Sequence, residues 1–368
     1  MPRRGVAIGA GIALLATLTA CLGAGSAPAT TAPSTTARAP RAAGFTNAAE
    51  AVMGTLTAPP TQRFLARIRN GKMGGVLFLG NDWLTRSKVK RITAELQTAA
   101  CTRGEPLLIA IDQEGGIVKR LSWAPPTEAP ADMKSATDAH AQAAATAAAL
   151  RRSGIDIDFA PVVDTPSSPN NFLGSRAFSR SRTWNAALGK AFVRGLQQNG
   201  IAATAKHFPG LGLAGGNTDN GQITINATKT KIEPGLLPFQ ATIDAGIKLV
   251  MVNTAIYPHL DASRTPAAFS KKIIDGILRE QLGFKGITVT DSLTAPAPSA
   301  IPHAATKAML AGSDLLIWGA ESAAERGYAT LVGDAPGSAS LRARLAQASG
   351  RIRALKTWLT AHGGPSCS

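Results

Sequence analysis

Charged and hydrogen-bonding side chains follow five short apolar runs of the chain, each at the point where the run ends. The five endings are Asp112-Gln113-Glu114, Pro161-Val162-Val163-Asp164, Lys206-His207-Phe208, Asn253-Thr254 and Thr290-Asp291-Ser292. A single Asp after a strand is common as a helix N-cap, but five such endings point to side chains gathered at one site. Carboxylates, cations and amides around a polar pocket suit the recognition of several hydroxyl groups. The residue types therefore indicate sugar chemistry.

Other chemistries lack their usual residue patterns. The five histidines are far apart, and the sequence contains neither His-Glu-x-x-His nor Cys-x-x-Cys, so we expect no metal site. No Gly-x-Gly-x-x-Gly follows the first predicted strand, which argues against a dinucleotide fold. We expect no cofactor.

The chain alternates between predicted strands and predicted helices. The strands are expected at Gly75–Leu79, Leu107–Asp112, Ile157–Asp164, Ala202–Phe208, Leu249–Tyr257, Ile287–Asp291 and Asp314–Trp318. The helices are expected at Ser87–Ala100, Asp132–Arg152, Arg182–Gln198, Leu236–Ala245, Lys271–Gln281, His303–Leu310 and Leu341–Leu359. This alternation requires parallel strands with helical crossovers and predicts an α/β fold, a (β/α)8 TIM-type barrel in a single catalytic domain. An eighth strand lies near Thr330–Val332, or the barrel is irregular.

Five ordered segments resemble motifs of glycoside hydrolase family 3. They run in order between about Gly74 and Gly319, most of the folded region. The segments are Ile111–Leu121 (DQEGG-R-V-x-R-L), Gly154–Asp164 (G-I-D-x-x-F-A-P-V-x-D), Gly174–Ser179 (G-x-R-S/A-F/Y-S), Lys206–Gly210 (K-H-F-P-G) and Leu282–Leu293 (L-G-F-x-G … [ST]-D-x-L). Within the family, the chain is most similar to single-barrel bacterial β-N-acetylglucosaminidases that act in cell-wall recycling.

The resemblance implies a role for each matched residue. Asp291 would be the nucleophile of a retaining double displacement, attacking the anomeric carbon to form a glycosyl-enzyme. A second set would hold the hydroxyls and the 2-substituent of a GlcNAc- or glucose-containing glycan: Asp112, Arg120, Arg176, Lys206 and His207. Charged hydrogen bonds of this kind set both orientation and affinity.

The chain departs from the family pattern around the general acid/base. The family loop after K-H-F-P-G ends in an Asp-x-His pair, and the aligned residues here are Asn217 and Asp219. Leu211 and Thr254 stand where the family has His, and Ile117 stands where it has Arg. The imidazole proton donor is therefore missing from its expected position.

Three functions follow from this pattern. The first is a retaining, exo-acting β-glycosidase, of β-N-acetylhexosaminidase or β-glucosidase type, in which Asp219 replaces the acid/base His. The second is a catalytically impaired sugar- or wall-binding lipoprotein with the same barrel. The third is a basic protein that binds a wall polymer. The nucleophile and the sugar-holding residues together favour the first, and the alternative to the role of Asp219 is a simple turn at 217–221.

The N-terminus has the pattern of a bacterial lipoprotein signal. Arg3 and Arg4 precede a short apolar run that ends in Leu18-Thr19-Ala20-Cys21, similar to a lipobox whose cysteine is lipidated. The protein is expected at the outer face of the cytoplasmic membrane, attached through this lipid. The predicted divisions are a signal peptide at 1–21, a disordered Ala/Thr/Pro/Ser-rich tether at 22–44, the barrel at 45–362 and a tail at 363–368.

Positive charge and three cysteines complete the sequence analysis. The net charge is +16, and because residues 1–43 contain four cations and no acid, residues 44–368 carry +12. With no run of five basic residues and 5% aromatics, we expect no nucleic-acid partner. If Cys21 carries lipid, Cys101 and Cys367 remain for a disulfide in an oxidising compartment, which would join the end of the first predicted helix to the tail just past the last one. We expect a monomer.

Overall fold

The computed structural model describes residues 46–80, 83 and 85–367. The predicted signal peptide, Cys21 and the tether lie outside these residues, so anchoring through Cys21 stays a prediction. None of the helices in the described part of the chain combines the length and the apolar character that a membrane span requires.

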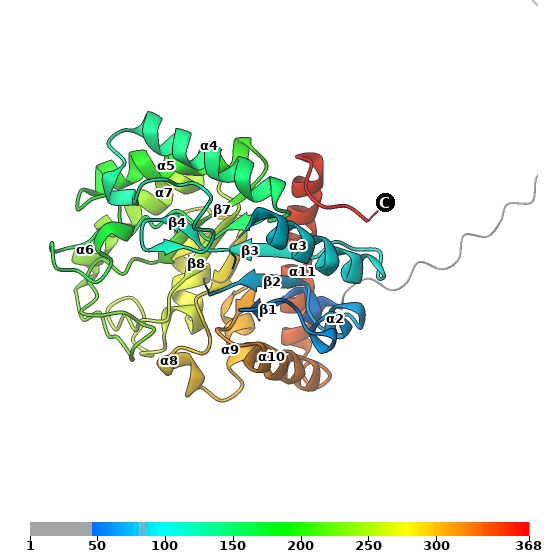
Figure 1. Cartoon of the computed structure of the whole chain (residues 1–368). Coiled ribbons are helices and arrows are strands. Elements are labelled where there is room, and N and C mark those ends of the chain that lie inside the picture. The colour runs from blue at the N-terminus through cyan, green and yellow to red at the C-terminus, as the bar shows by residue number, and fades with distance from the viewer. Residues whose placement is uncertain (1–45, 81–82, 84, 368) are drawn as a thin grey trace, which may run out of the picture. The chain divides into compact units, whose positions relative to one another are not determined.

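Eight parallel strands form the barrel, in chain order around its axis (Figure 1). They are β1 Val52–Leu56, β2 Gly75–Phe78, β3 Leu108–Ile111, β6 Ile157–Asp158, β7 Ala202–Phe208, β8 Leu249–Val252, β9 Ile287–Thr290 and β10 Leu316–Ile317. Strand β1 pairs with both β2 and β10, and a bridge between Val289 and Leu315 joins the remaining edges. The (β/α)8 barrel predicted from the alternation is confirmed.

The prediction of an eighth strand near Thr330–Val332 is wrong, because these residues lie within helix α10, Glu321–Asp334. The missing strand is β1, at the start of the described chain. Its sequence, Val-Met-Gly-Thr-Leu, is interrupted by Gly54, which weakens the apolar signal. Packing favours this glycine, since a Cβ at position 54 would lie 2.8 Å from the sulfur of Met73.

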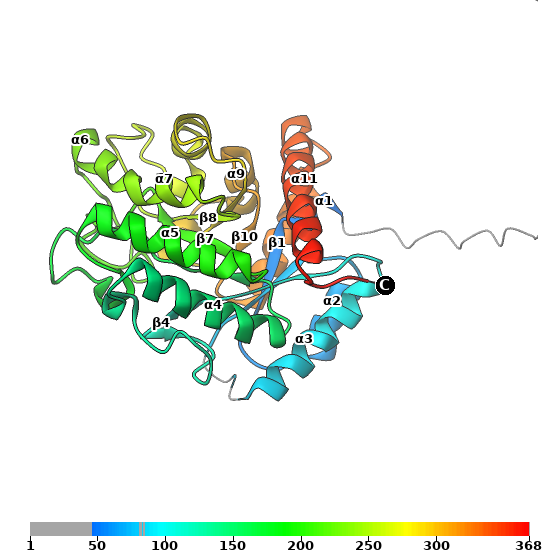
Figure 2. The ribbon, with the colours of Figure 1, turned by 90° about the horizontal axis from the view of Figure 1, so that it is seen from above.

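The helices surround the barrel (Figures 1 and 2). The α-helices are α1 Asn47–Glu50, α2 Gln62–Arg69, α3 Arg86–Cys101, α4 Ala136–Arg152, α5 Arg182–Gln198, α6 Lys229–Ile232, α7 Leu237–Asp244, α8 Pro296–Ser299, α9 Ala304–Ala311, α10 and α11 Ala339–Ala361. A π-helix (η5) spans Lys272–Gln281, and 3-10 turns occur at Pro130–Asp132, Gly174–Arg176, Glu233–Leu236 and Ala267–Phe269. Helix α5 and strand β7 have the predicted bounds.

Hydroxyl side chains start several of these helices. In each case the Ser or Thr oxygen accepts a hydrogen bond from a backbone N–H three residues later, which satisfies one of the unpaired donors of the first turn. The capping residues are Thr61 for α2, Thr85 for α3, Ser135 for α4, Ser181 for α5 and Ser338 for α11.

Two predicted strands are shorter than expected, for local reasons. The predicted strand Ile157–Asp164 keeps its regular ladder only through Asp158, and Pro161, which follows, has no N–H to donate. The strand predicted at Leu249–Tyr257 ends at Val252. Just beyond it, the Asn253 side chain donates to the His207 carbonyl of β7 and accepts from the Ala255 backbone N–H. Both irregular stretches lie at the carboxyl ends of their strands.

An apolar cluster fills the barrel between the amino-terminal halves of the strands. Residues near the strand starts, such as Leu108, Ile157 and Leu249, pack there with Ile352 and Leu355 of α11. Helix α11 therefore closes the end of the barrel opposite the strand endings. A second, larger cluster fills the layer between the strands and the surrounding helices.

A disulfide joins the C-terminal tail to the barrel. Cys101, the last residue of α3, is bonded to Cys367, with 5.2 Å between the two Cα atoms. The C-terminus accordingly lies beside α3 (Figures 1 and 2). The structure thus contains the pair expected from the sequence.

Candidate active site

A pocket of about 570 Å³ opens at the carboxyl ends of the strands. Asp112 follows β3, Lys206 and His207 lie at the carboxyl end of β7, and Asp291 follows β9. All seven residues for which the sequence predicted a catalytic or sugar-holding role line this pocket: Asp112, Arg120, Arg176, Lys206, His207, Asp219 and Asp291. Parallel strands bring their carboxyl ends to one face, which is why residues far apart in sequence meet there.

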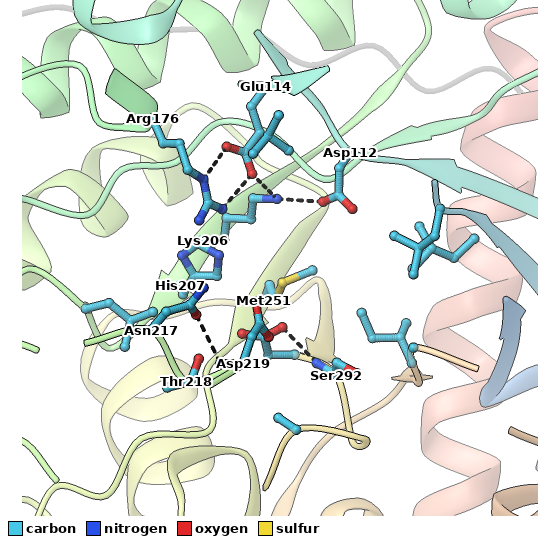
Figure 3. A pocket seen from close by; sticks show the side chains of 18 of the residues that line it. Asp112, Glu114, Arg176, Lys206, His207, Asn217, Thr218, Asp219, Met251 and Ser292 are labelled. Atoms are coloured by element: carbon cyan, nitrogen blue, oxygen red, sulfur yellow. Dashed lines mark hydrogen bonds and ion pairs between the residues drawn. The ribbon is translucent and has the colours of Figure 1, made fainter. Parts of the chain in front are cut away.

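One wall of the pocket is a network of paired charges (Figure 3). The Lys206 ammonium, buried to 2% exposure, lies 2.7 Å from Asp112 Oδ1 and 2.6 Å from Glu114 Oε1. Arg176 donates two hydrogen bonds of 2.8 Å to the same Glu114 carboxylate. Arg120 Nη2 lies 4.0 Å from Asp112 Oδ2. Two carboxylates and three cations therefore fix one another's positions.

Glu114 and Lys206 remain charged at neutral pH. Burial alone would raise the pKa of Glu114, but Lys206 and Arg176 outweigh it and hold that pKa at about 2. Burial would likewise lower the pKa of Lys206, but Asp112 and Glu114 raise it above its ordinary value. The network therefore offers fixed charges to a sugar hydroxyl, since such hydrogen bonds are stronger than neutral ones.

Glu114 is the site residue that sequence reasoning missed. It follows a predicted strand, but the sequence analysis gives it no role. It belongs to β4, Gln113–Gly115, which pairs with β5, Val118–Lys119, in a hairpin above β3. Because side chains alternate along an extended chain, Asp112 and Glu114 point the same way. The two-residue spacing between Asp112 and Glu114 is the sequence signal from which a role for Glu114 in the site could have been predicted.

The side chain of His207 is held by a buried carboxylate at the end of the preceding predicted strand. Asp164 Oδ2 accepts hydrogen bonds from His207 Nδ1 at 2.7 Å and from the His207 backbone N–H at 3.0 Å. Asp164 Oδ1 accepts from the Leu211 backbone N–H at 2.7 Å. The carboxylate acceptor assigns the proton to Nδ1, which leaves Nε2 available to the pocket.

Asp291 is a partly buried carboxylate that follows β9 and lines the pocket. Its Oδ1 accepts a hydrogen bond of 2.7 Å from the Ser292 backbone N–H. Burial raises the pKa of Asp291 above its ordinary value, and the charge of Asp219 raises it further, whereas His207 and Lys206 lower it. The pKa of Asp291 therefore depends both on the cationic side chains at the end of β7 and on the carboxylate of Asp219.

Asp219 lies on a loop that reaches the pocket from the end of β7. Its backbone N–H donates a hydrogen bond of 3.0 Å to the Asn217 side chain, so these residues form the turn that their types favour. Asp219 is exposed but lines the pocket together with Asn217 and Thr218 (Figure 3). The segment is therefore both a turn and a wall of the site.

The other departures from the family pattern occupy different places. Leu211 is buried and lines the pocket, and Ile117, 76% exposed, lines its mouth at the tip of the β4–β5 hairpin. Thr254 is buried outside the pocket lining. Among the described residues, no group of three His, Cys, Asp or Glu side chains is arranged to hold a metal ion.

The barrel and its charged pocket define a class of protein, and comparison with known proteins identifies that class. Residues 50–354 match the "Glycosyl hydrolase family 3 N terminal domain". The chain therefore belongs to glycoside hydrolase family 3, and the resemblance in its motifs is confirmed.

Particular relatives carry hexosaminidase names. A β-hexosaminidase of Nitrosomonas eutropha is 33% identical over 259 residues, 67% of this chain and 73% of the relative. A β-hexosaminidase of Bordetella avium is 33% identical over 274 residues, covering 70% and 76% of the two chains.

Solved structures agree. A family 3 β-N-acetylglucosaminidase from Paenibacillus sp. str. FPU-7 superposes with a TM-score of 0.81 at 30% identity, over 87% of this chain. This chain spans only 63% of the length of that Paenibacillus chain. A β-N-acetylhexosaminidase from Beutenbergia cavernae DSM 12333 gives a TM-score of 0.79 at 31% identity, over 84% of this chain and 97% of the other.

Proposed function

We propose that this chain is a retaining, exo-acting β-glycosidase of the β-N-acetylhexosaminidase type, which removes terminal sugars from cell-wall or other glycans. One observation carries the proposal: Asp291 and Asp219 line the same pocket, beside the paired charges of Asp112, Lys206 and Arg176. The names of the relatives support an N-acetylhexosamine over glucose as the terminal sugar.

In the first step, an Asp291 carboxylate oxygen attacks the anomeric carbon of the terminal sugar. The bond from that carbon to the glycosidic oxygen breaks, and Asp219 gives its proton to the departing oxygen. A covalent glycosyl-enzyme and a free alcohol result. Lys206, Asp112 and His207 hold the sugar hydroxyls, so the reacting atoms meet in a fixed orientation.

In the second step, the Asp219 carboxylate takes a proton from a water molecule. The water oxygen attacks the anomeric carbon, and the bond from that carbon to Asp291 breaks. Two inversions give net retention of the β-configuration, and both carboxyl groups return to their starting protonation states.

The decisive test is the turnover of nitrophenyl β-GlcNAc and nitrophenyl β-glucoside by the wild type and by Asp291→Asn. We expect the wild type to prefer the GlcNAc substrate and Asp291→Asn to lose at least about 10³-fold in kcat/KM, because the nucleophile is gone. Asp244→Asn is the matched control, since Asp244 is an exposed carboxylate at the end of α7. NMR should show the β-anomer as the first product.

Two results would contradict the proposal. If Asp291→Asn kept wild-type turnover, the nucleophile would lie elsewhere. If the wild type turned over neither substrate yet bound GlcNAc, the sugar-binding alternative would hold.

A further inference from the structure

The end of the barrel opposite the candidate active site carries a surplus of positive charge. Helix α11 covers this end (Figures 1 and 2), and its 23 residues include five cations and no acid. The segments that lead into the parallel strands lie at the same end, and they add four cations and four acids. We call α11 and these segments the basic face: 46–51, 70–74, 102–107, 153–156, 199–201, 245–248, 282–286 and 312–315.

Burial makes the positive surplus larger at the surface of the basic face. Among its acids, Glu50, Asp156 and Asp314 are buried, and only Glu105 is partly exposed. Two of the buried acids, Glu50 and Asp314, form ion pairs with three arginines of α11 and offset part of their charge. Eight of the nine cations nevertheless reach solvent: Lys72, Arg103, Lys248, Lys285, Arg342, Arg344, Arg351 and Arg353. The basic face therefore presents a positive potential to its surroundings.

The loops at the active-site end of the barrel show no such surplus. We count their charges from the end of each barrel strand to the next helix of at least eight residues. Among the described residues, these loops contain nine Lys or Arg and nine Asp or Glu. The charge of the barrel is therefore polarised between its two ends, and such a distribution orients a protein on a charged surface.

The described chain begins at the basic face. Helix α1 contacts α11, because Ser349 donates a hydrogen bond to Glu50 and Lys356 Nζ lies 3.3 Å from Glu50 Oε1. Figure 2 accordingly shows α1 beside α11. Cys21, the predicted site of lipid attachment, precedes Thr46, the first described residue, by 25 residues. An anchor at Cys21 would therefore attach the barrel from the side of its basic face.

The basic face lacks the large apolar anchors on which protein interfaces depend. The exposed positions of α11 between Arg342 and Thr357, apart from Arg353, are Ala343, Ala346, Gln347, Gly350 and Ala354. The large apolar side chains that are exposed in the described part of the chain lie on other elements: Ile117, Trp184, Leu213, Leu237, Leu310 and Val332. A lipid surface requires no such anchor, since its headgroups attract accessible positive charge.

We propose that the basic face contacts an anionic phospholipid surface and thereby turns the active-site pocket away from the membrane. Phosphate headgroups accept hydrogen bonds from guanidinium and ammonium groups, and each cation near the surface adds to the attraction. At physiological ionic strength this attraction is short-ranged, so the predicted lipid provides the attachment and the basic face sets the orientation. The inference is independent of the proposed function, because it concerns orientation and not turnover.

The first test is flotation of the full-length Cys21→Ser protein with vesicles at low ionic strength. Vesicles of phosphatidylglycerol are compared with vesicles of phosphatidylcholine, so that the difference reports binding to the anionic headgroup. The test variant removes three exposed cations of the basic face: Lys72→Gln, Lys285→Gln and Arg342→Gln. The matched control removes three exposed cations from loops at the active-site end: Lys134→Gln, Arg180→Gln and Lys231→Gln.

We expect the parent protein to bind the anionic vesicles, to bind the zwitterionic ones far less and to dissociate in high salt. Each cation removed from the basic face should weaken binding about fivefold, so the triple variant should lose about 10²-fold and its control much less. Lys72→Gln/Lys285→Gln alone should lose about 25-fold. This double variant excludes misfolding as the cause, since it keeps the hydrogen bonds of Arg342 to the Ala335 and Pro336 carbonyls.

The second test is amine labelling of the vesicle-bound wild type, which reports orientation. Lys72 and Lys285 should react several-fold more slowly on anionic vesicles than in detergent, whereas Lys134 and Lys231 should react equally in both, as measured by mass spectrometry. No binding to anionic vesicles, equal losses in the variant and its control, or equal protection of all four lysines would overturn the proposal. Binding to a soluble glycerol phosphate polymer in preference to vesicles would also overturn it, and would assign the basic face to a wall polymer.

Discussion

In the proposed mechanism, Asp219 is the residue on which proton transfer at this site depends. A carboxyl group can donate and then recover a proton, so it can perform the acid and base steps that an imidazole performs in the family pattern. The structure brings Asp219 to the pocket that holds Asp291, although the side chain stays exposed. Access to water suits the second step, in which water is deprotonated.

We predict that Asp219→Ala slows hydrolysis of a GlcNAc glycoside with a poor leaving group by about 10²–10⁴-fold, the usual contribution of general acid catalysis. The dinitrophenyl glycoside, whose leaving group needs little protonation, should keep nearly wild-type kcat/KM. Added azide should restore steady-state turnover by attacking the glycosyl-enzyme. Equal losses on both substrates without azide rescue would move the acid/base role to another residue.

The same variant should shift the pH profile of the nucleophile. Asp291 must be ionised to attack, and burial followed by the charge of Asp219 raises its pKa. Removing the Asp219 charge stabilises the Asp291 carboxylate and lowers its pKa. The acidic limb of kcat/KM for the dinitrophenyl glycoside should therefore move to lower pH in Asp219→Ala. An unchanged limb would mean that the two carboxylates do not interact in solution.

At the scale of elements, Asp164 connects three parts of the site. It follows the strand that begins with β6, and its carboxylate orients His207 at the end of β7. It also accepts a hydrogen bond from the Leu211 N–H, where the loop that carries Asp219 begins. Three donors therefore share two carboxylate oxygens. The motif Gly154–Asp164 ends in an Asp because this position faces both the end of β7 and the loop that follows β7.

We predict that Asp164→Asn lowers the free energy of unfolding by about 1–3 kcal/mol, because the amide leaves a buried donor without an acceptor. Activity should fall more than stability alone explains, since His207 loses its fixed tautomer. Asp156→Asn is the control in the same segment, because burial raises the pKa of Asp156 to about 8 and its carboxyl is already neutral at pH 7. Urea unfolding and kcat/KM would check this, and equal behaviour of both variants would contradict it.

At the scale of the whole molecule, the C-terminal tail is attached to the barrel by a covalent bond. The tail is tied to α3 by the Cys101–Cys367 bond, at the face opposite the active site, so the bond stabilises the barrel without touching catalysis. Closing so long a loop contributes up to about 5 kcal/mol in the chain-entropy description. We expect the N-terminal end to be attached to the membrane through the predicted lipid on Cys21.

We predict that the mature, exported protein has no free thiol, because Cys21 carries lipid and the other two cysteines are bonded. Alkylation of the denatured, unreduced protein should label nothing, and reduction should release two thiols. Cys21→Ser should move the protein from the membrane fraction to the soluble fraction, since a diacyl anchor holds where one chain does not. Labelling without reduction would refute the bond, and an entirely soluble wild type would refute the anchor.

The sequence by itself determined the architecture and most of the site. Strand endings with polar residues identified the pocket face, because parallel strands bring these endings together whatever the loops do. Five motifs were enough to assign the family and to select six of the seven proposed site residues, and the seventh, Asp219, came from its aligned position in the loop after Lys206–Gly210. These signals are local, since each depends on a few adjacent residues and on the regular alternation of strand and helix.

Only the tertiary structure decided how these residues pair. Lys206 contacts Asp112, 94 residues away in the sequence, and His207 contacts Asp164, 43 residues away. No local sequence pattern extends over such separations. Strand β1 was not predicted because Gly54 interrupts its apolar pattern, and the reason for this glycine is its close packing against Met73. The role of Glu114 depends on its contacts with Lys206 and Arg176, which only the fold creates. The loops after β6 and β7 likewise meet, through the hydrogen bond from the Ser167 N–H to the Gly212 carbonyl, because their strands are neighbours in the folded barrel.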